Sequence, residues 1–179
     1  MKKRSIALLL LLALLTGCGA KTEEAPWQTA YRETGKYLQE QDTLSAGSVG
    51  GEWAVIGLSR AGLLSDEAAQ SYEQAAEDYV KQADSGRLDR LKSTENSRTI
   101  LGLTAAGYNA ADVAGVDLTS GLSDMNYLRI QGLNGPIWAL IALDCHGYDI
   151  PQCAEGGEQT TRAGLVAEIL TSQCSDGGW

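Results

Sequence analysis

Phenylalanine is absent from the chain, histidine occurs once, and basic residues are scarce. Only 14 Lys and Arg stand against 23 Asp and Glu, which gives a formal net charge of −9 at pH 7. This shortage of positive charge argues against nucleic acid as a partner, because phosphate backbones bind to basic surfaces. The single histidine, His146, is distant in sequence from Ser48, Ser59 and Ser97, so no Ser–His–Asp triad is suggested. Without Phe, the core must be built from Leu, Ala, Ile, Val, Trp and Tyr.

The longest apolar run, Ile6 to Leu15, is ten residues long and too short to span a bilayer comfortably. Three basic residues precede it, and Thr16-Gly17-Cys18 follows. This arrangement resembles the signal of bacterial lipoproteins, which is cleaved before a cysteine that is then acylated. The resemblance implies a signal peptide over residues 1–17, a palmitate-type lipid on Cys18, and a tether over residues 18–25. The mature protein would then be anchored in the cell membrane on its extracytoplasmic face. An ordinary secretory signal is the alternative.

Removal of the signal peptide would leave a more acidic chain. Residues 1–17 contain three basic and no acidic residues, so the remainder has a net charge of −12. This charge argues against a basic patch that grips anionic lipid, and attachment would therefore depend on Cys18. We expect residues 26–179 to form one domain, since their number is sufficient for a hydrophobic core.

A ten-residue sequence motif occurs three times, at 53–62, 98–107 and 138–147. Each copy is largely apolar and ends in glycine, and the closing glycines are 45 and then 40 residues apart. A helix with no polar face is buried on all sides, and a glycine just after its end provides a left-handed cap. A period of this size indicates stacked helical hairpins rather than a single packed globule.

Buried helices alternate with two-faced helices along the chain. The sequence predicts helices at 26–41, 53–61, 65–86, 96–106, 110–118 (short and weak), 135–145 and 160–172. Loops are predicted over the glycine-rich 45–51 and most of 120–134, with a turn or two after Met125. The alternation favours an all-α fold in which an outer ring of helices surrounds an inner ring of parallel ones. An irregular helical bundle is the alternative.

The end of the chain carries a second signal, Gln173, Gly177 and Trp179, spaced as Q-x3-G-x-W. Together with Arg162-Ala-Gly-Leu165, Gly135-Pro-Ile-Trp138 and Gly50-Gly-Glu-Trp53, it resembles the QW repeats of the squalene cyclase and protein prenyltransferase superfamily. More narrowly, the chain resembles prenyltransferase-like repeat domains on exported surface proteins of Firmicutes. The animal cobalamin carriers share this architecture, the α/α toroid.

This resemblance covers about residues 27 to 179. In the motif, we expect Gln173 to bond the end of a neighbouring helix, Gly177 to allow a tight turn, and Trp179 to stack on an adjacent repeat. The motif normally leads into another inner helix, whereas this sequence stops at Trp179. About seven helices are fewer than a closed toroid needs, so we expect a partial toroid. Its open edge would be a place for a protein partner.

The catalytic groups of that superfamily are not evident. The acid run D-x-D-D of terpene cyclases does not occur. Prenyltransferases hold zinc with Asp, Cys and His, but the adjacent Asp144, Cys145 and His146 diverge by about 100° per residue on a helix. We therefore predict no catalytic residue, no metal and no cofactor. Cys145 and Cys153 flank a turn and either form a disulfide or remain free thiols.

If the toroid has a pocket, the N-terminal ends of the inner helices should line it. The candidate ligand-binding residues are then Glu52, Trp53, Arg98, Asn134 and Trp138. Trp53 and Trp138 occupy the same repeat position, and packing in the core is the alternative role for both. We expect a non-enzymatic binding or scaffold domain for a small amphiphilic or corrinoid-like ligand. The alternative is a fragment of a terpenoid cyclase or prenyltransferase-like enzyme whose catalytic residues lie in further C-terminal repeats.

Overall fold

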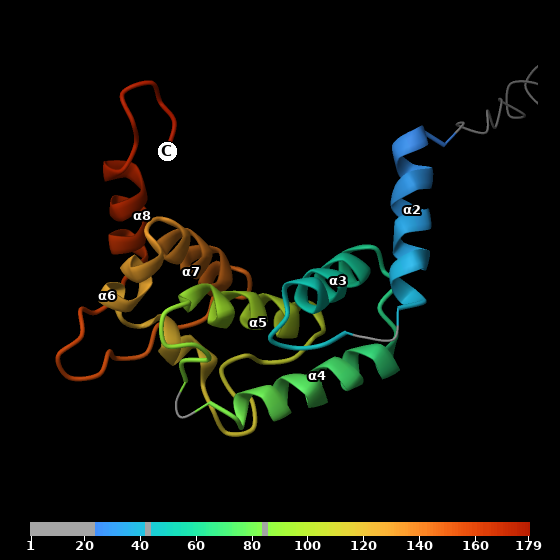
Figure 1. Cartoon of the computed structure of the whole chain (residues 1–179), viewed down its shortest axis with the longest axis horizontal. Helices are drawn as coiled ribbons and strands as arrows, with labels where there is room; N and C mark the ends of the chain where they lie inside the picture. Colours follow the sequence, from blue (N-terminus) through green and yellow to red (C-terminus); the bar gives the residue numbers. More distant parts are fainter. Residues whose placement is uncertain (1–23, 42–43, 84–85) are drawn as a thin grey trace, which may run out of the picture. The chain divides into compact units, whose positions relative to one another are not determined.

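The computed structural model describes residues 24–41, 44–83 and 86–179, and these residues form an all-α fold (Figure 1). The predicted signal peptide, Cys18 and most of the tether lie outside them. Of the described residues, 24–33 belong to one unit and those from Thr34 to Trp179 belong to another. The helices are α2 (Pro26–Gln39), α3 (Val49–Arg60), α4 (Asp66–Val80), α5 (Ser93–Ala105), η1 (Leu118–Leu122), α6 (Met125–Leu128), η2 (Arg129–Gln131), α7 (Asn134–Asp144) and α8 (Arg162–Thr171).

Helix α5 is the centre of the larger unit. It packs against α3 and α7, and Figure 1 shows it between them. Helix α4 also packs on α5, and α8 packs on α7. The buried core follows this arrangement, with Ile100 and Leu103 of α5 among its fully covered side chains. In the absence of Phe, Tyr72 and Tyr127 are the largest of the fully buried side chains.

The three closing glycines end their helices as predicted. Gly62, Gly107 and Gly147 have φ values of 66°, 91° and 67°, a left-handed conformation that glycine adopts without steric cost. The residue after each glycine donates its N–H to a carbonyl five positions earlier, as in Leu63 to Leu58 at 2.9 Å. This is the Schellman pattern, and its occurrence at all three glycines confirms that the repeated motif forms the same helix end each time.

Several predicted boundaries are wrong. Helix α3 begins at Val49, so the second half of the predicted glycine-rich loop is helical, because the Ser48 hydroxyl accepts the Gly51 N–H at 3.0 Å and caps it. Helix α4 is capped by the Ser65 hydroxyl, which accepts the Ala68 N–H at 3.2 Å, and it ends at Val80 rather than near residue 86.

The connection after α5 was also misjudged. The weak helix predicted over 110–118 is absent from this described stretch, which instead turns back at Ala114, with φ 51° and a bridge between Val113 and Val116. The turn or two predicted after Met125 is confirmed by α6 and η2. The short helix η1 replaces predicted loop over 118–122, and Asp117 and Asp124 cap the first turns of η1 and α6.

Candidate ligand-binding site

The expectation that the three repeated helices are buried on all sides is wrong, because α3, α5 and α7 each carry a stripe of side chains of which none is fully buried. The three stripes occupy equivalent positions. On each helix the stripe residues follow one another at intervals of four, three and four positions, which places them on one face. All of them line one of two hollows except Ile141, which is 44% exposed. The stripes are Val49, Trp53, Ile56 and Arg60 on α3; Thr94, Arg98, Leu101 and Ala105 on α5; and Asn134, Trp138, Ile141 and Cys145 on and just after α7.

The hollow at the N-terminal ends of these helices has a volume of about 310 Å³. Trp53, Arg98, Asn134 and Trp138, four of the five predicted site residues, line it. The prediction missed three further lining residues, Val49, Thr94 and Gln131. Val49 and Thr94 precede Trp53 and Arg98 by one helical turn, so the repeat register contained the signal for them. Gln131 belongs to η2 and has no such signal.

Two tryptophans form the aromatic wall of the hollow. The ring centroids of Trp53 and Trp138 are 5.4 Å apart, and their planes are inclined by 58°. Tilted pairs at this separation attract each other through the charge distribution of the rings. Trp53 is 40% exposed, so it is not the buried core residue of the alternative interpretation, and Trp138 is partly buried. The pair joins α3 to α7 across α5.

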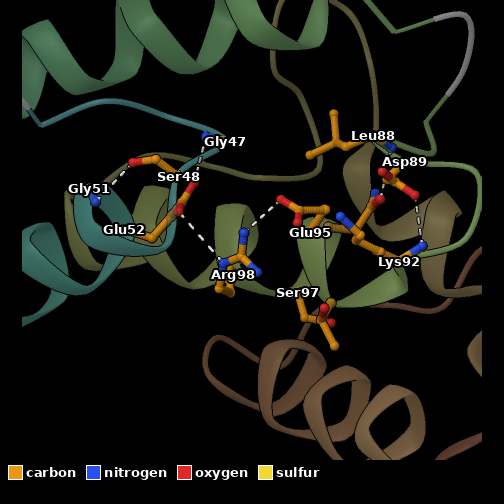
Figure 2. Close-up of polar contacts among 12 residues, drawn as sticks. Gly47, Ser48, Gly51, Glu52, Leu88, Asp89, Lys92, Glu95, Ser97 and Arg98 are labelled. Atoms are coloured by element: carbon orange, nitrogen blue, oxygen red, sulfur yellow. Dashed lines mark hydrogen bonds and ion pairs between the residues drawn. The ribbon is translucent and has the colours of Figure 1, made fainter. Parts of the chain in front are cut away.

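Glu52, Glu95 and Arg98 form a largely buried ionic cluster (Figure 2). Arg98 reaches between two carboxylates: its Nη2 donates to Glu95 at 2.6 Å, and its Nε is 3.7 Å from Oε2 of Glu52. Glu52 is fully buried and does not line the hollow, but its Oε1 accepts the Gly47 N–H at 2.7 Å. Glu52 Oε2 and Arg98 Nε lack hydrogen-bond partners and are held by charge attraction. The cluster therefore carries one negative charge in excess when both carboxylates are ionised.

Burial controls the ionisation of this cluster. Desolvation raises the pKa of Glu52 above its usual range, and the Gly47 N–H and the Arg98 charge only partly oppose the effect. The buried hydroxyl of Tyr72 also has a raised pKa, through desolvation first and the Glu52 charge second. The net charge of the cluster therefore depends on pH, because Glu52 resists ionisation while Arg98 remains cationic.

Glu52→Gln is expected to change how stability depends on pH. A carboxyl whose pKa rises on folding contributes stability that is fully present below its unfolded pKa of about 4.3. That contribution is lost as the pH rises through the folded value. The free energy of unfolding of the wild type, minus that of the variant, should therefore fall as the pH rises from about 4. Urea unfolding at a series of pH values measures this difference, and a difference that rises with pH would contradict the raised pKa.

Asp144, Cys145 and His146, the three adjacent residues considered as zinc ligands, each make another contact in the structure. Asp144 bonds Arg162 at 2.6 Å, the Cys145 thiol donates to the Ala142 carbonyl at 3.1 Å, and the His146 ring lies 5.3 Å from that of Tyr148. Among the residues described, no group of three His, Cys, Asp or Glu side chains is placed to hold a metal ion. Cys145 and Cys153 are free thiols in the structure, as is Cys174, so the disulfide suggested by the turn is not formed.

The C-terminal motif forms its turn but not the contacts that the resemblance implied. Gly177 has a φ of 88°, which allows the tight turn. Gln173 donates to the Gly177 carbonyl at 2.8 Å, within the same turn rather than to a neighbouring helix. The Trp179 indole N–H donates to Ile169 of α8 at 2.6 Å, and the ring is 59% exposed rather than stacked on another repeat. The motif therefore closes the end of its own helix.

Comparison with known proteins adds no relative. No protein-family model matches the chain, and no curated protein or solved structure is significantly similar to it. Within 24–41, 44–83 and 86–179, no helix is long and apolar enough to cross a membrane.

Proposed function

We propose that the chain is a lipid-anchored, extracytoplasmic domain that binds a small amphiphilic ligand in the hollow beside Trp53 and Trp138. The observation that carries this proposal is the convergence of two accessible indole rings and several polar side chains in one concavity. Pockets of this kind, with aromatic walls and a few polar groups, are the usual form of small-molecule sites. The anchor is proposed from the basic and apolar segments that precede Cys18.

The architecture that we propose is a partial α/α toroid. Its support is the common register of the three stripes, since equivalent positions of α3, α5 and α7 meet at the same hollow. This requires the three helices to run in the same direction, and the connection that contains α4 returns the chain between the first two. An inner layer of parallel helices with outer helices between them is the arrangement of the toroid.

The size of the hollow limits the ligand. Its volume of about 310 Å³ is at the lower end of the range for ligand pockets, about 300–1,000 Å³. A corrinoid is too large to be enclosed and would contact the hollow only by its edge. A small amphiphile, or one ring of a larger molecule, fits better, and the corrinoid part of the expectation is not retained.

Binding of a neutral amphiphilic dye, N-phenyl-1-naphthylamine, to the full chain tests the proposal. Energy transfer from tryptophan to the dye should be saturable, and Trp53→Ala should weaken the binding about tenfold through loss of aromatic contact. Trp27→Ala is the matched control, because Trp27 is 68% exposed and lies in the other unit. Non-saturable binding, or binding that Trp53→Ala leaves unchanged, would refute a site at this hollow.

A further inference from the structure

We infer that the hollow takes a neutral sugar ring, a pyranose, with one apolar face on the indole wall and its hydroxyl groups on the polar rim. This inference rests on the proposed binding function and names the ligand class for the same site.

The charges around the hollow favour a neutral ligand. Among the described residues, Arg98 is the one ionisable residue that lines the hollow, and its guanidinium already contacts Glu95 and Glu52. An anion would meet a guanidinium whose charge is matched by two carboxylates, in a chain of net charge −9. Neither Glu52 nor Glu95 lines the hollow, so a cation there would face the Arg98 side chain and no carboxylate. The site therefore offers an ionic ligand of either sign little net attraction.

The aromatic wall suits the apolar face of a sugar ring. The indoles of Trp53 and Trp138 form an angled surface, and 40% of Trp53 is exposed. The face of an aromatic ring is negative, so it attracts the weakly positive C–H groups that line one face of a pyranose. Such a ring is apolar on its faces and polar around its edge, which matches a wall bordered by polar groups.

The polar rim of the hollow offers hydrogen bonds to hydroxyl groups. Its uncharged polar side chains are those of Thr94, Gln131 and Asn134. Gln131 is held in place, since its Oε1 accepts the Thr94 N–H at 3.0 Å and its Nε2 donates to the Thr94 hydroxyl at 3.2 Å. The exposed amide of Asn134 is free of side-chain hydrogen bonds to the described part of the chain, and it presents a donor and an acceptor together.

This rim disfavours a plain hydrocarbon. An alkyl chain in the hollow would remove water from the amide and guanidinium groups without replacing their hydrogen bonds, which is costly. Neighbouring hydroxyl groups on a sugar replace those bonds, because each both donates and accepts.

Saturation-transfer-difference NMR on the full chain tests the inference with four compounds at equal concentration: methyl β-D-glucopyranoside, N-acetyl-D-glucosamine, choline and octanoate. We expect transfer to the ring C–H protons of at least one pyranoside, with a Kd of about 1 mM. Trp53→Ala should reduce this affinity about tenfold. Asn134→Ala should also reduce it without lowering the melting temperature, because Asn134 is exposed. Asn126→Ala, an exposed asparagine outside the hollow, is the matched control.

The outcomes separate the inference from the function on which it rests. If choline or octanoate binds in a manner sensitive to Trp53→Ala and neither pyranoside does, the sugar inference is wrong and the binding function stands. If a pyranoside binds equally well to Trp53→Ala and Asn134→Ala, the sugar does not use this hollow and the inference is also wrong. If none of the four compounds and no dye binds, both are refuted.

Discussion

Arg98→Ala is expected to lower the free energy of unfolding by about 3 kcal/mol, since removing one partner of a buried ion pair leaves the other charge uncompensated. The side chain of Arg98 is 12% exposed and contacts Glu52, which is fully buried, and Glu95, which is 13% exposed. Glu52 can take up a proton in the variant, which limits the loss to the lower part of the range observed for such pairs. Equilibrium urea unfolding at neutral pH measures the change.

Arg90→Ala is the matched control, because Arg90 is exposed and lies on the connection before α5. Its effect should be within about 0.5 kcal/mol of zero. The double variant Glu52→Gln with Arg98→Ala should lose less than Arg98→Ala alone, since the uncompensated buried charge is then absent. A loss below about 1 kcal/mol for Arg98→Ala would contradict a buried cluster at this position.

Gly135→Ala is expected to destabilise the protein by about 3 kcal/mol, at the upper end for overpacking. Gly135 is buried in the first turn of α7, and a Cβ atom there would lie 1.9 Å from the carbonyl oxygen of Leu128. That oxygen belongs to the backbone of α6, so no side chain can rotate away to relieve the clash. The helices would have to move apart, and thermal or urea unfolding would report the loss.

Gly50→Ala is expected to have the opposite effect on stability, although Gly50 occupies the position of α3 that corresponds to Gly135 in α7. It lies in the first turn of α3, and a Cβ atom there would have no neighbour within 4 Å. Gly50→Ala should therefore stabilise the protein by about 0.5–1 kcal/mol, because alanine loses less conformational freedom in a helix than glycine. If Gly135→Ala stabilised the protein as Gly50→Ala should, the packing of α6 on α7 would differ from that in the structure.

The helices were predicted better than the connections between them. Helices α3, α5 and α7 were found because their apolar residues and closing glycines recur, and both are requirements of the backbone and the core. Four of the five site residues meet at the hollow because they share that register. Glu52 is one position away from Trp53, so its side chain leaves the helix in another direction, and it is buried beside Arg98 instead of lining the hollow.

The connections were harder to predict for a physical reason. The start of α3 and the short helices after Asp117 and Asp124 depend on single side chains that accept backbone N–H groups. Such caps act over a few residues and leave no periodic pattern in the sequence. The contacts of Gln173 and Trp179 were misjudged because the QW resemblance assumes a following helix, whereas here the two side chains bond within the turn and to the end of α8.

The shared register of the three stripes determines where this protein tolerates changes in chain length. The spacing from Val49 to Thr94 exceeds that from Thr94 to Asn134 by five residues, and the whole difference lies in the connections between helices. One residue inserted in α5 before Leu101 would rotate the following side chains by about 100° and turn Leu101 away from the hollow that it lines. Insertions between helices leave the stripes aligned. Divergence in length should therefore concentrate in the connections, while the interiors of α3, α5 and α7 keep a constant number of residues.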